Sequence, residues 1–396
     1  MNKLRARILL FATLVVFSLS VHYCSRAEAQ EKKYSWLDKI DEAKQMLKNV
    51  ELKHSVKIVT YKETRKLPAQ VKKKKSKILT TKRTDYAWKE AGLVLMNTET
   101  GEIKLIKIRK EGQKLFNLDK EFTVEIEPRV NGITWNGRNT AFRVVAPDGW
   151  IVIANGWIDL VSGKPAERIY FPYSTSLHQD ELIKMGDFHL EGHFVAAVAE
   201  LHSLGVISLA NSDKKVSETM SFLFPINLVL VELTDPQEFY AFKSGTLKFN
   251  PFDRVKILLA GNGEGAFSTY NYAGAVGLTQ FTRGTWNIIK KKYPLAKLPE
   301  FNVGAMQHIE SIMAAILLYD YNLNELKKVF GEKILDDEKL DHYLYAAHNC
   351  GIGRVIKAIK RTKTGQDWRV ALRKLGKTDE TIIFLEKVDY LLKSRY

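Results

Sequence analysis

The sequence contains very little cysteine, with only Cys24 and Cys350 among its 396 residues. Cys24 lies in an N-terminal segment that we expect to be removed, which leaves Cys350 as the only cysteine of the mature chain. A single thiol cannot form an internal disulfide framework. The sequence also lacks an internal repeat, a phosphate-binding glycine loop and the ligand spacing of a calcium-binding loop. These absences exclude a disulfide-stapled domain, a repeat fold and the common nucleotide-binding motifs.

The N-terminus lacks an apolar run long enough to span a bilayer comfortably. Residues 1–29 instead have the pattern of a secretory signal, in which basic residues precede the apolar run Ile8 to Val21 and the small-x-small sequence Ala27-Glu28-Ala29 follows it. We therefore expect an exported protein of the periplasm or cell envelope. An uncleaved signal that anchors the chain in the membrane is the alternative.

Acidic residues are fewer than basic ones, 45 against 61, which gives a formal net charge of +16. The surplus is concentrated in the N-terminal part around Lys72, Lys73, Lys74 and Lys75. Such a run raises the local concentration of polyanions. Anionic wall polymers or membrane surfaces are the expected partners, and export makes nucleic acid the less favoured one. A solvated loop without a partner is the other interpretation.

The pattern of apolar residues predicts an α+β fold, with a small β-rich N-terminal domain followed by a mainly helical one. Within residues 30–90, Ser35 and the apolar stripe from Trp36 to Leu47 predict a short capped helix, followed by a basic linker. Residues 91–178 are predicted to form the β-rich domain, whose function the sequence does not reveal. Residues 180–396 are predicted to be helical, with the principal motifs in 250–396.

Two hairpins are expected in the β-rich domain. Leu93 to Met96 and Ile103 to Ile108 flank a turn that contains Thr100-Gly101. Trp150 to Ala154 and Trp157 to Leu160 flank Asn155-Gly156, a strong hairpin signal.

Three histidines in the helical part invite comparison with a metal site. His189 and His193 share one face of a helix at i, i+4 spacing, but His202 lies nine residues after His193, on the opposite side of a straight helix. The apolar residues of the same segment form an ordinary core stripe. The sequence therefore predicts neither a metal site nor a cofactor.

Glu264 is the candidate general acid. Asn250-Pro251 has the pattern of a helix start, and the helix would end at Gly263-Glu264-Gly265. The partial negative charge of the helix end and the neighbouring Phe267 and Tyr272 would disfavour a carboxylate and raise the pKa of Glu264. A raised pKa is what a general acid requires.

A turn-rich segment, Ala273 to Gln280 (AGAVGLTQ), follows Glu264. Gly274 and Gly277 permit positive φ and the close approach of a ligand. A tight connection between two helices is the alternative interpretation.

Glu264 with Phe267, the segment Ala273 to Gln280 and the segment Ala347 to Val355 (AHNCGIGRV) resemble, in order and approximate spacing, the soluble lytic transglycosylase family of the lysozyme superfamily. The resemblance covers roughly residues 240–396. It implies a helical lysozyme-like domain that cleaves peptidoglycan glycan strands at the β-1,4 bond between N-acetylmuramic acid and N-acetylglucosamine. Glu264 would protonate the bridging oxygen and then take a proton from the C6 hydroxyl that attacks C1, so that a 1,6-anhydro end forms without water.

The resemblance also implies roles for other residues. Gly277, Leu278, Thr279 and Gln280 would bind the substrate, with His348 and Asn349 opposite, and Tyr272 would stack on a sugar ring unless it packs in the core. His348 stands where the family has the tyrosine that usually contacts the catalytic acid, while Gly265 and Thr279 replace a serine and a methionine. Hydrolysis of the same bond by water and a non-catalytic wall-binding module are the alternatives.

Overall fold

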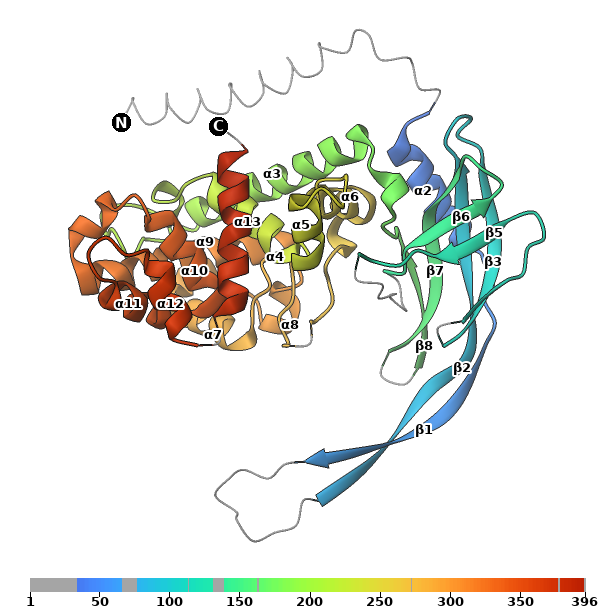
Figure 1. Ribbon diagram of the computed structural model, residues 1–396, viewed down its shortest axis with the longest axis horizontal. Helices are drawn as coiled ribbons and strands as arrows, with labels where there is room; N and C mark the ends of the chain where they lie inside the picture. Colours follow the sequence, from blue (N-terminus) through green and yellow to red (C-terminus); the bar gives the residue numbers. More distant parts are fainter. Residues whose placement is uncertain are drawn as a thin grey trace.

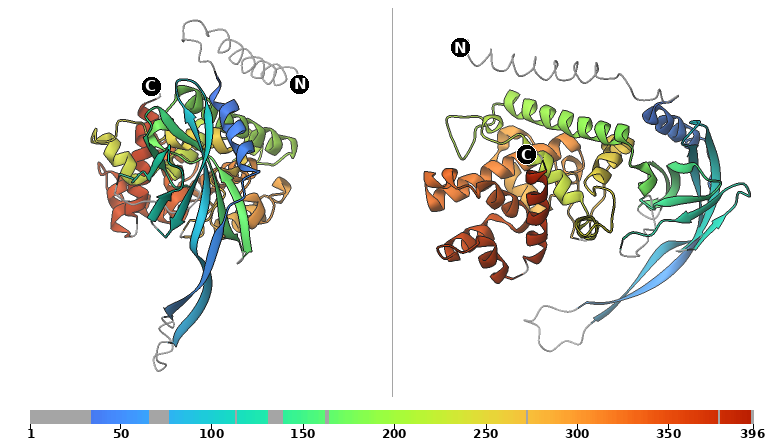
Figure 2. Two further views of the ribbon diagram at one scale, coloured as in Figure 1. Left: turned by 90° about the vertical axis from the view of Figure 1, so that its right-hand side faces the viewer. Right: turned by 45° about the horizontal axis from the view of Figure 1, so that its top comes forward.

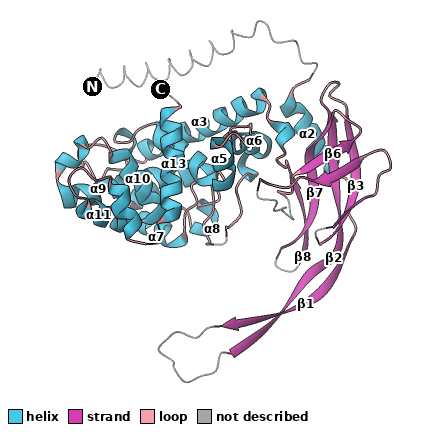
Figure 3. Ribbon diagram, viewed as in Figure 1, coloured by secondary structure: helices cyan, strands magenta, loops and turns pink. Residues whose placement is uncertain are grey.

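The structure is a computed structural model that describes residues 34–65, 77–112, 114–130, 139–161, 164–271, 273–376 and 378–394. The chain is a mixed α+β protein in which an N-terminal antiparallel sheet lies beside a helical C-terminal part (Figures 1 and 3). The predicted fold class is confirmed at this level. The predicted signal (residues 1–29), the lysine run (residues 72–75) and Tyr272 lie outside the described residues.

Helix α2 (Trp36–Leu47) begins as the sequence predicts. The Ser35 side chain accepts a hydrogen bond from the Asp38 backbone amide at 3.4 Å and so caps the first turn. The stripe that includes Trp36, Ile40 and Leu47 is buried against the sheet. This burial, more than the propensity of a helix of three turns, stabilises α2.

The main sheet has six antiparallel strands built around β2 (Lys77–Asn97). The strand order is β4-β3-β2-β7-β8, and β1 pairs with the first half of β2. The remaining strands are β1 (His54–Arg65), β3 (Ile103–Glu111), β4 (Lys114–Asn117), β7 (Trp150–Val161) and β8 (Lys164–Tyr170). The prediction of a basic linker reaching residue 90 is therefore wrong. The many charges of this stretch concealed a high content of Val, Ile and Thr, which favours strands.

Strand β1 and the first half of β2 extend beyond the rest of the sheet as an arm (Figures 1 and 2). Val56 and Ile58 on this arm are 48% and 74% exposed. The second half of β2 pairs instead with β3 and β7 and is buried on both faces. One strand thus serves both the projecting arm and the sheet core.

The first predicted hairpin is confirmed, because β2 and β3 pair on either side of the turn at Thr100-Gly101. The second is wrong, because β7 runs without a turn through Asn155 and Gly156. Gly156 pairs with Gly92 of β2, and a Cβ on either residue would meet Leu47 Cδ2, at 3.3 and 2.8 Å respectively. These glycines therefore let α2 pack closely on the sheet.

A second layer, formed by β5 (Thr123–Ile126) and β6 (Phe142–Ala146), packs on the other face of the main sheet. Alternate residues of β2 point to the two faces, with Leu93 and Leu95 toward the β5–β6 layer and Val94 and Met96 toward α2.

The helical part begins with α3 (Asp180–Ser203), which starts beside α2 and the sheet and runs away from them along one side of the helical part (Figure 2). Helix α9 (His308–Phe330) carries a long series of buried residues and lies in the core of this part. No helix among the described residues is long and apolar enough to cross a membrane. The other helices are α4 (Leu223–Leu233), α5 (Pro236–Lys243), α6 (Asp253–Asn262), α7 (Arg283–Lys292), α8 (Phe301–Gly304), α10 (Leu340–Cys350), α11 (Ile352–Arg361), α12 (Trp368–Lys374) and α13 (Asp379–Lys393).

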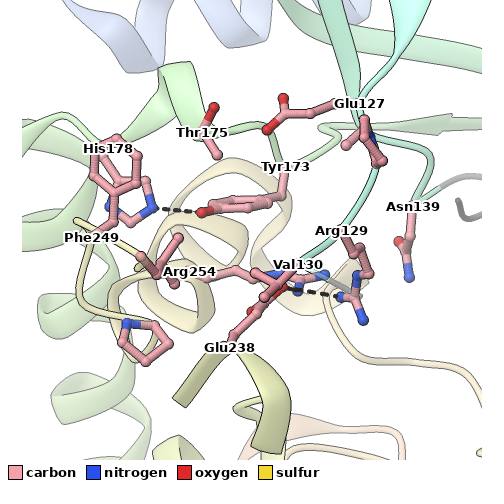
Figure 4. Close-up of a pocket in the computed structure, with 14 residues that line it drawn as sticks. Glu127, Arg129, Val130, Asn139, Tyr173, Thr175, His178, Glu238, Phe249 and Arg254 are labelled. Atoms are coloured by element: carbon pink, nitrogen blue, oxygen red, sulfur yellow. Dashed lines mark hydrogen bonds and ion pairs between the residues drawn. The ribbon is translucent and has the colours of Figure 1, made fainter. Parts of the chain in front are cut away.

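The two parts of the molecule are joined by ion pairs around a small pocket (Figure 4). Arg129, from the loop after β5, lies 3.0 Å from Asp235 and 3.9 Å from Glu238 of α5. Arg254 of α6 contacts Glu238 at 2.7 Å. These side chains are at most a quarter exposed, so the pairs are only weakly screened by solvent and salt. They fix the start of α5, directly after α4.

Candidate functional site

A groove of about 600 Å³ in the helical part collects several residues that the sequence singled out. Gln280, His348 and Asn349 line it together, although the chain separates Gln280 from the other two by almost 70 residues. Their predicted proximity is confirmed. Two carboxyl groups that the sequence analysis did not consider, those of Glu232 and Glu380, line the same groove.

Glu232 is the penultimate residue of α4, whose other residues are almost all apolar and buried. Its side chain is 14% exposed, at the wall of the groove. The buried ammonium group of Lys387, from α13, donates hydrogen bonds to the carbonyl oxygens of Val231 and Thr234. A cation at this position satisfies carbonyls that the end of a helix leaves without partners.

The surroundings of Glu232 favour its neutral form. Burial raises the pKa of Glu232 well above the usual range of a glutamate; the positive charge of Lys387 lowers it, and the negative charge of Glu380 raises it further. The last carbonyl groups of α4 give its C-terminal end a partial negative charge, which also disfavours ionisation of Glu232. A carboxyl group in such a position keeps its proton at neutral pH and can donate it to a substrate.

His348 lies between Glu232 and the main chain of the turn-rich segment. Its Nε2 donates to the carbonyl oxygen of Thr279 at 2.9 Å and lies 3.7 Å from Glu232 Oε1. Burial lowers the pKa of His348 to about 4, so the ring is neutral near pH 7. A neutral His348 ring brings no positive charge that would favour the ionised form of Glu232.

Two amide side chains are held in fixed orientations at the groove. Gln280, at a φ of +50°, donates from Nε2 to the carbonyl of Gly277 at 2.8 Å and accepts from Asn271 Nδ2 at 3.0 Å. Asn349 Oδ1 accepts from the hydroxyl of Thr381 at 2.7 Å. Such restraint reduces the entropy lost when polar groups bind a sugar.

Gly277, Leu278 and Thr279 lie behind the groove wall rather than in its lining. Gly277 has the predicted positive φ, +82°, but a Cβ there would lie 1.8 Å from the carbonyl oxygen of Ala305. Leu278 and Thr279 are fully buried, and the Thr279 hydroxyl lies 2.7 Å from that of Ser311 in α9. The approach that Gly277 permits is therefore a packing contact, as the alternative of a tight connection predicted.

Glu264 lies in a short 3-10 turn (Gly263–Gly265) at the end of α6, as predicted, but outside the groove lining. His193 Nε2 contacts its carboxylate, which also accepts a hydrogen bond from the backbone amide of His308 at 3.3 Å. Partial burial alone would raise the pKa of Glu264, but the charge and hydrogen bonds of His308 and His193 outweigh it and lower the pKa. The predicted raised pKa is therefore wrong.

A candidate metal-binding group is present that spacing along α3 alone does not reveal. His202 does turn away from the other two histidines of α3 and contacts the Ser217 hydroxyl at 3.2 Å. However, His308 and Glu264 join His189 and His193, and one ligand atom from each lies within 4.8 Å of all the others. Two of the four ligands come from distant segments, so spacing along α3 could not reveal the group.

Sequence reasoning missed Glu232, although one signal was present. Residues 223–233 (LFPINLVLVEL) form an almost wholly apolar stretch with a single carboxyl group near its end. A charged side chain in such a stretch is costly to bury, so its presence indicates a function.

Comparison of the chain with protein-family models, with curated proteins and with solved structures finds no match in any of the three.

Proposed function

We propose that the protein is an exported peptidoglycan lytic transglycosylase, with a lysozyme-like helical domain and with Glu232 as its catalytic acid and base. The observation that carries this proposal is a buried carboxyl group with a raised pKa, placed in one groove with His348, Gln280 and Asn349. This is the environment that we expected for Glu264, found around a different residue.

The motifs of the resemblance to the transglycosylase family imply Glu264 as the acid, but one contact that the resemblance also implies is made by Glu232 instead. His348 stands where that family has the tyrosine that usually contacts the catalytic acid. The carboxyl group that His348 approaches is that of Glu232, at 3.7 Å. Glu264 instead contacts two other histidines, which stabilise its charged form.

The reaction proceeds in two steps with one carboxyl group. Glu232 gives its proton to the oxygen that links N-acetylmuramic acid to N-acetylglucosamine, and the bond between that oxygen and C1 breaks. The C6 hydroxyl of the muramic acid then attacks C1 and returns its proton to the Glu232 carboxylate. The product carries a 1,6-anhydro ring, and water is not consumed.

The residues around Glu232 would bind the sugars on either side of the cleaved bond. Gln280 and Asn349, held by Asn271 and Thr381, are suited to hydrogen-bond N-acetyl and hydroxyl groups. His348 would stabilise the groove wall through Thr279 and keep a neutral ring beside the acid.

Hydrolysis of the same bond is the second candidate, because Glu380 lines the same groove as Glu232. A second carboxylate could activate a water molecule, as in glycosidases that use a pair of acids. We favour the anhydro reaction because Glu380 is exposed and the family that the chain resembles uses one acid.

Digestion of purified peptidoglycan separates the candidates. Anhydro ends are one water lighter than reducing ends, so mass spectrometry of the released fragments distinguishes the two products. We expect anhydro ends from the wild-type protein and none from Glu232→Gln. Reducing ends would support hydrolysis, and binding without cleavage would support a wall-binding module.

The lysines between β1 and β2 would add a wall-binding function. Residues 72–75 stand between β1 and β2 in the sequence, and their charge suits anionic wall polymers or membrane surfaces. Replacing these four lysines by glutamine should lower co-sedimentation with isolated walls at low salt. Unchanged co-sedimentation would refute this part of the proposal.

A further inference from the structure

Three histidines and one glutamate from three separate segments meet outside the groove. His189 and His193 lie one turn apart on α3, Glu264 lies in the turn after α6, and His308 is the first residue of α9. His189 Nε2 lies 3.2 Å from His308 Nδ1, which is 3.7 Å from Glu264 Oε1. His193 Nε2 contacts the same carboxylate oxygen.

Hydrogen bonds to the main chain fix which ring nitrogens carry hydrogen. His193 Nδ1 lies 2.7 Å from the carbonyl oxygen of His189, and His308 Nε2 lies 3.1 Å from that of Ala266. Because a carbonyl oxygen only accepts, each of these nitrogens is the donor. The opposite nitrogens, His193 Nε2 and His308 Nδ1, therefore carry lone pairs in the neutral rings.

These lone pairs face the Glu264 carboxylate, which is also an acceptor. The short contact between His193 Nε2 and Glu264 Oε1 requires a cation, either a proton or a metal ion, whereas His308 Nδ1 can also accept from His189 Nε2 at 3.2 Å. Metal-binding histidines commonly donate their other N–H to a carbonyl or carboxylate, as His193 and His308 do here. The arrangement is therefore that of a metal site with its outer hydrogen bonds already formed.

The spacing of the four atoms fits a tetrahedral ion. Bonds of about 2.0–2.1 Å to nitrogen and oxygen place neighbouring ligands about 3.3 Å apart in a tetrahedron. Two of the six separations, at 3.2 and 3.7 Å, are close to this value and all six are within 4.8 Å, so binding would require small shifts, including a slight separation of the His193–Glu264 pair. Three imidazoles and one carboxylate suit zinc and other divalent first-row transition metals better than calcium or magnesium.

We propose that His189, His193, Glu264 and His308 bind one divalent transition-metal ion that fastens α3, the end of α6 and the start of α9 together. Four protein ligands complete a tetrahedral shell, which is typical of a structural site. The His308 side chain is fully buried and that of Glu264 is 59% exposed, so the ion has an inner anchor and an entry path. This proposal does not depend on the proposed glycan cleavage.

The site would also stabilise the groove from behind. Ser311, one turn after His308 in α9, binds the Thr279 hydroxyl, and the Thr279 carbonyl accepts from His348. An ion that fixes the first turn of α9 therefore restrains one wall of the groove.

Zinc binding to the untagged, chelator-treated protein tests the proposal, with zinc titrated against a chromophoric chelator and Co²⁺ absorption as a measure of tetrahedral geometry. We expect one ion per chain and a higher melting temperature with zinc. Replacing even an outer partner of a metal ligand costs about 10–100-fold in affinity. We therefore expect a loss of about 100-fold or more in His193→Ala and in the conservative Glu264→Gln, whose exposed position preserves folding.

His202→Ala is the matched control, because His202 lies on the same helix but outside the cluster. It should bind zinc as the wild type does. Absence of stoichiometric binding by the folded wild type, or equal weakening in His202→Ala, would overturn the proposal and leave a shared proton as the cation between His193 and Glu264. Because the measurement is binding, its failure is distinguishable from failure of the proposed reaction.

Discussion

Replacing Glu232 by glutamine should abolish glycan cleavage while leaving the protein folded. A general acid contributes about 10²–10⁴-fold to a rate. At about 1.36 kcal/mol for each factor of ten, this loss is about 2.7–5.4 kcal/mol of transition-state stabilisation. We expect the upper part of this range, because Glu380, the other carboxyl group lining the groove, is exposed.

The structure indicates why folding should survive the change. Glu232 is neutral in its raised-pKa environment, so an amide of similar shape replaces a neutral acid. The hydrogen bonds of Lys387 go to the carbonyls of Val231 and Thr234 and persist in the variant. At a pH below about 4.3, where the side chain is neutral in the unfolded chain as well, we therefore expect a change of about 1 kcal/mol or less in the free energy of unfolding.

The assay is the initial rate of release of anhydro fragments from purified peptidoglycan, compared for the wild type, Glu232→Gln and Glu264→Gln. Circular dichroism and thermal unfolding check that each protein is folded. When both proteins are assayed free of metal, Glu264→Gln should retain the cleavage rate of the wild type, since its carboxylate lies outside the groove lining. Full activity in Glu232→Gln together with loss in Glu264→Gln would refute the assignment and return the acid role to Glu264.

Three further predictions follow from particular contacts. The pKa of Glu232 is higher in the folded state than in the unfolded chain. The free energy of unfolding of the wild type should therefore fall relative to that of Glu232→Gln as pH rises above about 4.3. Parallel pH dependence of the two free energies, measured by urea unfolding, would contradict this. Lys387→Met should lower the free energy of unfolding by about 1–3 kcal/mol, because it leaves buried carbonyls unsatisfied. It should also move the alkaline limb of the pH–activity profile to higher pH, because Lys387 lowers the pKa of Glu232. An unchanged alkaline limb would show that the charge of Lys387 does not affect Glu232. A left-handed backbone costs a non-glycine residue about 1–2 kcal/mol. Gly277→Ala should destabilise the protein by more than this, because its Cβ would also meet the Ala305 carbonyl. Gly274→Ala has open space around its Cβ and should show only the backbone strain in the same urea titrations.

Periodicity in the sequence determined the broad organisation of the chain. The apolar stripe of α2, the β2–β3 hairpin and the change to helices at Asp180 were all predicted, because each depends on residues close together in the sequence. The Asn155-Gly156 turn was wrong, because the reason for Gly156 is Leu47, more than 100 residues away. Local turn signals cannot show such a contact.

The residues of the candidate site also divide into those that the sequence indicated and those that only the tertiary structure revealed. The motifs that contain Gln280, His348 and Asn349 could be recognised in the sequence, and the fold brings them to one groove. Which glutamate accompanies them was decided only by tertiary structure, because a pKa depends on burial and on charges from distant segments. Lys387 and Glu380 act on Glu232, and His308 acts on Glu264, across chain separations of more than 40 residues.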